Sequence, residues 1–246
     1  MCKEWFRKKQ PVITAAEHRL LTFRRNKYGG GNDLNGCVND SHNIAGAFTK
    51  AIPGIVVHKY LDYSVTEDNY LKALDQSIAL LPPGATVIMI MDSCYSGTAT
   101  RNGIMTEYRK NRFIGSDENI PEHTIKKVAR TEFMKWIAIS AARENQTASD
   151  AMIGSQYVGA FSYYAYKVLK SGMTWREWYN AIRLYLPGNG FEQEPTIEGP
   201  DFLLDRIIGQ GPTLIVHNSS HGSWQRDDSG DESDSKDEGL YFDHLS

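Results

Sequence analysis

The sequence has few cysteines: Cys2, Cys37 and Cys94 are the only three among 246 residues. An odd and low number cannot build a disulfide framework and indicates free thiols in a reducing compartment. The start, MCKEWFRKKQ, carries positive charge but no apolar run, so it does not resemble a secretory signal. We therefore expect a cytoplasmic protein.

Long apolar runs and a large excess of one charge are absent too. No stretch approaches the roughly 18 apolar residues that span a bilayer, and a formal net charge of -3 gives no reason to expect nucleic acid as partner. The sequence contains no internal repeat. With 41% hydrophobic and 23% charged residues, the composition is typical of a soluble globular protein. We expect one domain over residues 1–246 and neither membrane nor nucleic acid among its partners.

Apolar runs alternate with amphipathic stretches along the chain. This alternation predicts an α/β fold, with a mostly parallel sheet covered by helices on both faces. A polar, basic stretch at about 100–132 predicts a mobile loop, and the stretch at about 225–239 predicts an acidic, solvated loop. Asn39 or Asp40 is a plausible cap for the first helix. Strands are expected at 18–23, 55–61, 86–92, 133–142, 203–209 and 213–217, and helices at 36–52, 67–81, 157–171 and 173–186.

Cys94 follows the apolar run TVIMIMD, in the sequence DSCYSG. The carboxyl ends of strands in open α/β sheets are where binding and chemistry collect. Unpaired cysteines are more often small buried apolar residues than nucleophiles, but small neighbours here leave room for a substrate backbone. A thiol needs a nearby base or positive charge to become a thiolate near neutral pH.

His221 is the histidine that fits this requirement best. It follows the apolar run TLIVH and lies among small residues in NSSHGS. By contrast His18 begins a strand, His42 lies in a helix and His123 lies in the predicted mobile loop. Parallel neighbours in a sheet lie about 4.8 Å apart, so adjacent strands would bring Cys94 and His221 together as a thiol–imidazole pair.

Several segments together resemble the landmark segments of metacaspases, which are relatives of caspases. They are DSCYSGT, GCVND, SSHGS, SAARENQTA, GAFSYYAYKVL and QEPTIEG, and they extend over nearly the whole chain. The resemblance implies a caspase-like fold, with a mostly parallel central sheet of about six strands flanked by helices. It also implies hydrolysis of peptide bonds by a Cys–His dyad.

The resemblance also implies roles for individual residues. The nucleophile falls on Cys94 and the base on His221, while the backbone N–H groups of Gly222 and Cys94 become the oxyanion donors. This implies a cysteine endopeptidase that cleaves protein or peptide substrates after Arg or Lys, with a monomer favoured. The pocket for the basic side chain falls on Cys37, Asp40, Ser219 and Asp92.

The order of the segments departs from the family. In metacaspases the strand with the histidine and its acidic loop precede the strand with the cysteine, whereas here that block occupies 211–243. We therefore expect a rearranged strand order, in which 213–217 inserts beside 86–92. A dyad is recognised by geometry and not by sequence order, so the chemistry need not change.

Calcium and self-cleavage are two further expectations from the resemblance. Many metacaspases need calcium, and Glu67, Asp68 and Asp237 are candidate ligands. Arg101 occupies a place where a further carboxylate is expected, so we expect calcium to be a modest activator and no cofactor to be required for the chemistry. The basic loop predicts autoprocessing, with Lys126, Lys127 and Arg130 as the leading cleavage sites.

Two other functions remain open at this point. One is a catalytically silent caspase-like module that acts by binding or regulation, for which the cysteine, the histidine and the acidic pocket would all be unnecessary. The other is an unrelated Cys–His acyl transferase or amidase, which would not need the acidic pocket. Reaction with a thiol-directed peptide inhibitor would separate the active enzyme from the silent module.

Overall fold

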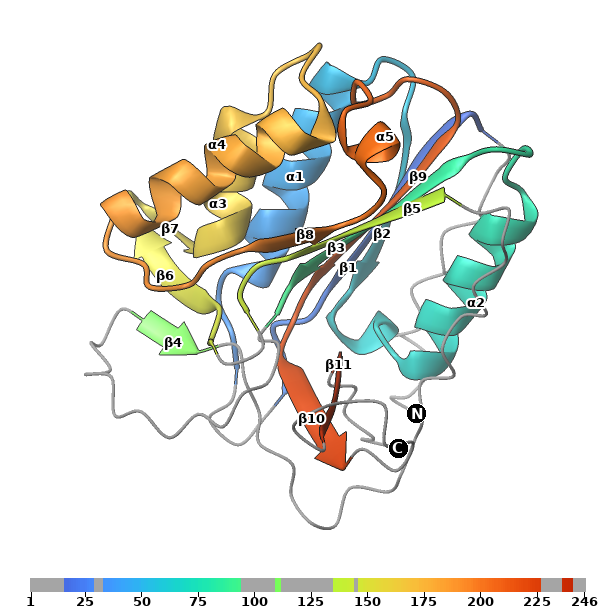
Figure 1. Ribbon diagram of the computed structural model, residues 1–246. Helices are drawn as coiled ribbons and strands as arrows, with labels where there is room; N and C mark the ends of the chain where they lie inside the picture. The colour runs from blue at the N-terminus through green and yellow to red at the C-terminus, as the bar shows by residue number, and fades with distance from the viewer. Residues whose placement is uncertain are drawn as a thin grey trace, which may run out of the picture.

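The computed structural model describes residues 16–28, 33–93, 109–111, 135–143, 146–226 and 236–240. Its centre is a six-stranded sheet with helices on both faces (Figure 1), which confirms the predicted α/β class. Five strands run parallel, and the edge strand β8 is antiparallel to its neighbour. In spatial order the strands are β2 (Val56–Leu61), β1 (His18–Arg24), β9 (Thr213–Ser219), β3 (Thr86–Asp92), β5 (Lys135–Ser140) and β8 (Thr196–Glu198).

The last strand of the central sheet in sequence, β9, lies between β1 and β3. Its seven residues pair in register with both neighbours, so that Ser219 lies opposite Arg24 on one side and Asp92 on the other. All seven are buried. The expected insertion of 213–217 beside 86–92 is therefore confirmed, and the strand extends two residues further than predicted.

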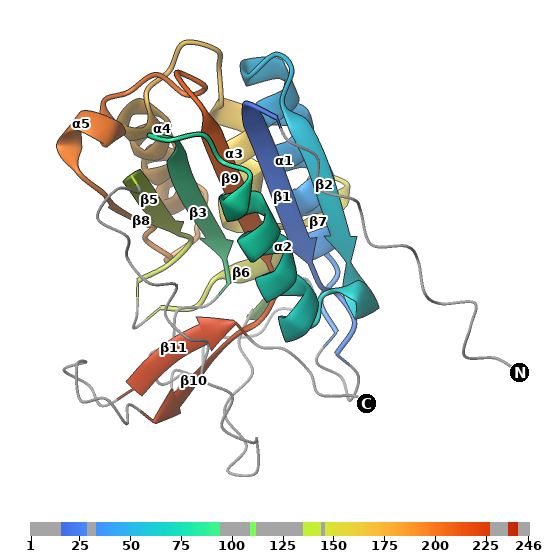
Figure 2. The same cartoon turned by 90° about the vertical axis from the view of Figure 1, so that its right-hand side faces the viewer.

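The helices divide between the two faces of the sheet. Figure 2 shows α2 (Glu67–Ala79) alone in front of one face, while the other face carries α1 (Cys37–Ala51), α3 (Ala160–Val168), α4 (Trp175–Gly188) and the short α5 (Asp201–Leu204). The alternation of side chains along each strand produces two cores. In β3, for example, Ile88 and Ile90 pack toward the larger helical layer, and Val87 packs toward α2.

The first helix begins earlier than its predicted cap. Gly36 is the N-cap of α1, and neither Asn39 nor Asp40 caps the helix. Asp40 is instead buried in the first turn, where it bonds to other elements. The prediction of a cap here was wrong because a carboxylate near a helix start can equally serve a tertiary partner.

The apolar segment 203–209 is not a strand. Its first residues belong to α5, and the chain then turns back toward β9. The sixth strand is β8, which pairs antiparallel with β5 through Thr196, Ile197 and Glu198. A short apolar run buried at the end of a sheet cannot be separated from a strand by periodicity alone, which explains the error.

Two small sheets lie at the carboxyl edge of the central sheet. The first joins β4 (Arg109–Asn111), β6 (Ser149–Ile153) and β7 (Gln156–Gly159), so part of the predicted mobile loop is a strand and the predicted helix at 157 begins three residues later. The second is a hairpin of β10 (Gly222–Arg226) and β11 (Lys236–Leu240), so both ends of the predicted acidic loop are strands.

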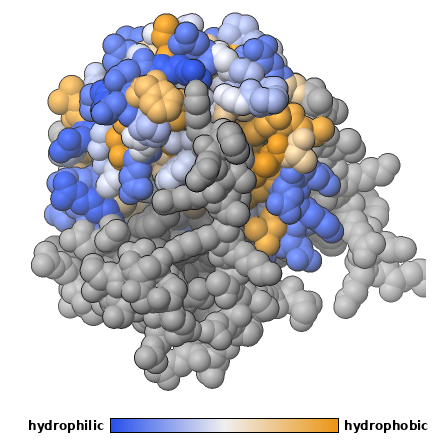
Figure 3. All heavy atoms as spheres, turned by 45° about the vertical axis from the view of Figure 1, so that its right-hand side comes forward, coloured by the Kyte–Doolittle hydropathy of each residue, from blue (hydrophilic) through white to orange (hydrophobic). Residues whose placement is uncertain are grey.

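No helix among the described residues is long and apolar enough to cross a bilayer. The side of the molecule seen in Figure 3 is mostly hydrophilic over its described part, with smaller hydrophobic areas.

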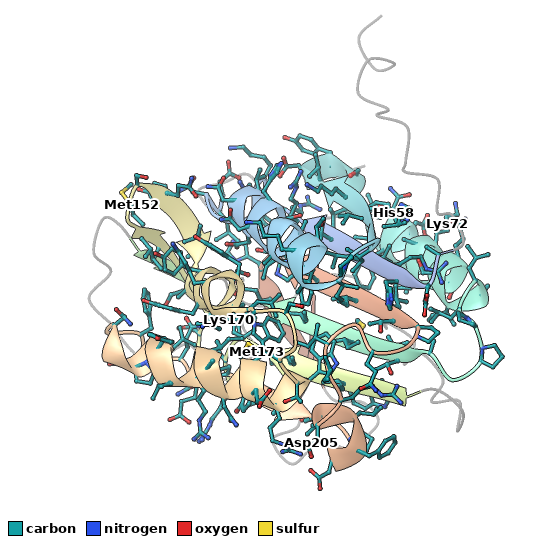
Figure 4. All side chains as sticks on the ribbon, turned by 90° about the horizontal axis from the view of Figure 1, so that it is seen from above. His58, Lys72, Met152, Lys170, Met173 and Asp205 are labelled. Atoms are coloured by element: carbon teal, nitrogen blue, oxygen red, sulfur yellow. The ribbon has the colours of Figure 1, made fainter. Side chains whose placement is uncertain are left out.

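His58 lies on β2 near α2 (Figure 4) and is only 5% exposed. Its neighbour Arg19 is fully buried and donates a hydrogen bond to the backbone oxygen of Ser77 near the end of α2, at 3.1 Å. Burial lowers the pKa of His58 below its ordinary value, and the positive charge of Arg19 lowers it further.

This lowered pKa predicts that acid destabilises the fold through His58. The unfolded chain takes up a proton near pH 6.5, the ordinary value, more readily than the folded chain does. The contribution of neutral His58 to the free energy of unfolding is therefore fully present above pH 6.5 and is lost as the pH falls below it. His58→Gln should show a smaller drop in the free energy of unfolding between pH 7.5 and pH 5.5 than the wild type. Urea denaturation at both pH values measures this, and equal drops would contradict the prediction.

Candidate functional site

The candidate residues that the structure describes lie at the carboxyl edge of the central sheet. The parallel register of β3 and β9 places Asp92 opposite Ser219. Cys94 follows Asp92 by two positions and lies outside the described residues. His221 follows Ser219 by the same two positions. The register therefore brings the chain to the same edge of the sheet at Asp92, two residues before Cys94, and at Ser219, two residues before His221.

His221 is held closely by the surrounding structure. It is 3% exposed, and its backbone N–H donates a hydrogen bond to the Tyr28 hydroxyl at 3.0 Å. The two aromatic rings also meet, with centroids 4.6 Å apart and an interplanar angle of 67°.

Two of the other histidines in the described part of the chain, His18 and His58, lie away from this edge, whereas His42 contacts Arg24 at the end of β1 and His217 contacts Ser162, which bonds to Asp92. His18 begins β1 at the opposite end of the sheet, and His58 lies within β2. His42 is exposed on α1. His217 is buried within β9, where its Nε2 lies 3.2 Å from the Ser162 hydroxyl. His123 and His244 lie outside the described residues.

Asp40 joins three elements that meet at this edge. One carboxylate oxygen accepts the backbone N–H of Gly159 at 2.8 Å, and the other accepts the hydroxyl of Ser219 at 2.8 Å. Its side chain therefore links α1, the start of α3 and the end of β9. Asp40 has no solvent exposure, so these charge-assisted bonds replace the water that the carboxylate has lost.

Asp92 meets the same helix start from the other side. Its carboxylate accepts the backbone N–H of Ser162, in the first turn of α3, at 3.1 Å. The first N–H groups of a helix have no partner within the helix and carry the positive end of its dipole. The start of α3 therefore supplies backbone N–H donors to two buried carboxylates, Asp40 and Asp92.

Cys37 completes the expected pocket group. It lies one turn before Asp40 on α1, and its backbone N–H donates to the side-chain oxygen of Asn26 at 3.0 Å. The thiol is buried beside Tyr28 and Leu34. The structure thus gathers all four predicted pocket residues around the starts of α1 and α3.

The pocket that these four residues would form is closed. Cys37, Asp40, Asp92 and Ser219 have no exposed surface. Two hollows in the described surface lie elsewhere. One is beside Leu80 and Pro82, where the chain leaves α2, and the other is between the last turns of α1 and α3 near Lys50 and Lys170. Neither hollow contains a candidate residue.

Gly222, the predicted oxyanion donor, begins β10 and lies opposite Leu240 of β11. The hairpin therefore starts directly after His221. The sequence had placed Gly222 in a loop.

Three residues that support the site were missed by the sequence reasoning: Asn26, Tyr28 and Asp150. Asp150, buried in β6, accepts the backbone N–H groups of Asn35 at 2.8 Å and of Gly36 at 3.2 Å. A Cβ at position 36 would collide with the Asp150 carboxylate, so this close approach requires glycine. Asn26 and Tyr28 could have been found, since both follow the strand predicted at 18–23 at its carboxyl end. Nothing in the sequence pointed to Asp150.

The described residues include no group of three or more His, Cys, Asp or Glu side chains suited to a metal ion. Glu67 and Asp68 lie together in the first turn of α2. Asp237 lies on β11, and Arg101 lies outside the described residues. The calcium site therefore stays a prediction.

Comparisons with known proteins indicate the fold alone. No family model matches the sequence, and no curated protein matches it. Among solved structures, the protein GSU0716 from Geobacter sulfurreducens is similar, with a TM-score of 0.58 and 18% sequence identity. The match covers 78% of this chain and 98% of that one. At this identity the likeness supports the α/β fold and says nothing about activity.

The contacts of Asp40 predict a large loss of stability for Asp40→Asn. An amide has one acceptor oxygen, so its NH2 group would face the donor of Gly159 or of Ser219. Leaving a buried donor without an acceptor costs about 1–3 kcal/mol. Urea denaturation should therefore show this loss for Asp40→Asn. The control Asp75→Asn, at an exposed position of α2, should change the stability by no more than about 0.5 kcal/mol. Equal stabilities of the two variants would refute the role of Asp40 as a link.

Proposed function

We propose that this chain is a cysteine endopeptidase of the metacaspase type, in which Cys94 is the nucleophile and His221 the base, and that it cleaves after Arg or Lys. The observation that carries the proposal is the parallel register of β3 with β9. The two candidate residues follow opposed residues by equal distances along neighbouring strands. The buried acidic residues Asp40 and Asp92, at the same edge of the sheet, support the choice of a cationic substrate.

The proposed reaction begins with transfer of the Cys94 thiol proton to the imidazole of His221. The thiolate sulfur attacks the carbonyl carbon of the Arg or Lys residue, and the backbone N–H groups of Cys94 and Gly222 stabilise the oxyanion. The C–N bond breaks, and the leaving amine takes the proton from His221. Water then hydrolyses the thioester, releasing the acid product and regenerating the thiol.

Recognition of the basic side chain is assigned to Asp40 and Asp92, with Cys37 and Ser219 beside them. Both carboxylates already accept N–H groups from the start of α3. Backbone N–H groups carry no net charge, and the proposal therefore expects the carboxylates to attract the cationic side chain of a substrate. All four residues have no solvent-exposed surface. The proposal therefore requires that the residues packed around them move aside when a substrate binds.

Other parts of the proposal concern regulation. Self-cleavage is assigned to Lys126, Lys127 or Arg130, which lie outside the described residues. Calcium enters as an activator only, since the chemistry above needs no metal. The proposed partners are protein or peptide substrates, and the proposed active form is a monomer in the cytoplasm.

Cys94→Ala and His221→Ala should each abolish peptidase activity. Loss of either member of such a dyad lowers kcat on the order of 10³-fold or more, because nucleophile and base act as one unit. Turnover of a fluorogenic peptide ending in Arg measures the effect. His18→Ala is the matched control, because His18 begins β1 at the opposite end of the sheet, and it should keep wild-type turnover.

The same assay separates the alternatives. A wild-type protein that neither cleaves Arg peptides nor reacts at Cys94 with a thiol-directed peptide inhibitor would exclude the peptidase and favour a silent binding module. Reaction at Cys94 with no cleavage of any peptide would favour an acyl transferase or amidase.

The acidic pocket predicts strong discrimination among matched peptides. Arg peptides should be cleaved at least as well as Lys peptides, because a guanidinium can bind both carboxylate oxygens at once. Asp peptides should hardly be cleaved. Asp92→Asn should lower kcat/KM for the Arg peptide on the order of 10²-fold, the usual effect of removing one partner from a buried charge pair. Alkylation of Cys94 by iodoacetamide should be unchanged, which separates lost recognition from lost folding. Preference for Asp peptides would overturn the pocket assignment.

A further inference from the structure

Tyr28 lies at the centre of a small buried group between β1 and α1. It is 7% exposed and packs with Leu34 and Cys37. Its backbone N–H donates to the Asp33 carboxylate at 2.8 Å, and the other oxygen of Asp33 pairs with Lys27 at 2.8 Å. The short segment after β1 thus holds Tyr28 firmly in one position.

Both parts of Tyr28 contact His221. The hydroxyl accepts the backbone N–H of His221 at 3.0 Å, and the two rings meet at a centroid distance of 4.6 Å and an angle of 67°. One side chain therefore restrains both the main chain and the imidazole of His221. Contacts of this kind fix an orientation, because a hydrogen bond and an edge contact between rings both depend on angle.

We propose that Tyr28 is the positioning residue for the base of the proposed peptidase, with its hydroxyl anchoring the His221 backbone and its ring setting the orientation of the imidazole. This inference rests on the proposed function. Tyr28 does not enter the reaction itself.

The phenol suits this role because it remains neutral. Burial raises the pKa of Tyr28 well above its ordinary value of 10.0, and the neighbouring Cys37 raises it further. The guanidinium of Arg25, 4.9 Å from the centre of the Tyr28 ring, acts weakly in the opposite direction. A phenolate beside His221 would hold the imidazole in its protonated form. The neutral hydroxyl accepts the N–H bond without adding a charge that would trap the proton.

Tyr28→Phe tests the inference because it removes only the hydroxyl and leaves the ring in place. A displacement of about 1 Å at a reacting group can cost about 10²-fold in rate. We expect kcat for the Arg peptide to fall about 10- to 10²-fold. KM should be unchanged, since the bonds of Asp40 and Asp92 to the start of α3 do not involve the Tyr28 hydroxyl that the variant removes. A role confined to packing would not separate kcat from KM in this way.

Matched variants sharpen the test. Tyr60→Phe removes a buried phenol on the α2 side of the sheet, where the ring stacks on Phe23 at 4.6 Å, and should leave kcat unchanged. Tyr28→Leu removes the ring as well and should lower kcat further. The kcat of Tyr28→Phe should therefore lie between those of Tyr28→Leu and the wild type. Asp33→Ala removes the acceptor of the Tyr28 backbone N–H and keeps the Tyr28 side chain, and it should lower kcat by a smaller factor. This variant keeps the inference testable if Tyr28→Phe fails to fold.

The two proposals fail in different ways. Wild-type protein that cleaves the peptide while Tyr28→Phe and Asp33→Ala keep the full kcat would overturn the inference alone. Wild-type protein that neither cleaves peptides nor reacts at Cys94 would overturn the proposed function and the inference with it.

Discussion

β9 hydrogen-bonds to β1 on one side and to β3 on the other from Thr213 to Ser219, and every element of the candidate site is arranged around its carboxyl end. In a strand that is buried on both faces and paired on both edges, the backbone N–H and C=O groups cannot bond to water and must bond to the neighbouring strands. Its register is therefore strongly determined, because a slip of one residue would exchange its two apolar faces. The fixed register places Ser219 beside Asp92 and brings His221 to the edge where the chain continues toward Cys94.

The electrostatics of the site follow from the same arrangement. Ser219 donates to Asp40, which also accepts the N–H of Gly159, while Asp92 accepts the N–H of Ser162. Two carboxylates are thus buried at the start of α3, where a helix offers N–H donors and a positive dipole end. The arrangement therefore brings both carboxylates to the start of the same helix, where each accepts a backbone N–H group. This is the physical basis for assigning them to recognition of a basic side chain, and it also makes Asp40 a link that the fold needs.

The sequence predicted the central elements well, because their signals are local. Continuous apolar runs at 86–92 and 213–217 indicate strands buried on both faces, and the helical spacing at 67–81 ends at two prolines. Predictions from local signals were wrong where the residue pattern of a segment fits more than one type of secondary structure. The apolar segment 203–209 contains α5 and turns, and residues 149–159 form β6 and β7 around the turn at Gly154, which has a φ of 68°. The acidic stretch concealed the two strands of the β10–β11 hairpin, since cross-strand pairing is not visible in composition.

The residues of the candidate dyad and pocket were determined by the sequence alone, through their position after apolar strands and their resemblance to a known family. The tertiary structure decided which of them meet. It inserted the last central strand between the first and third, turned Asp40 from a cap into a link between α1, α3 and β9, and placed Tyr28 against His221. Asp150 became part of the site only because β6 folds against the start of α1. A sequence pattern carries information about neighbours along the chain, whereas these contacts join residues more than a hundred positions apart, and only the pairing of strands and the packing of helices brings them together.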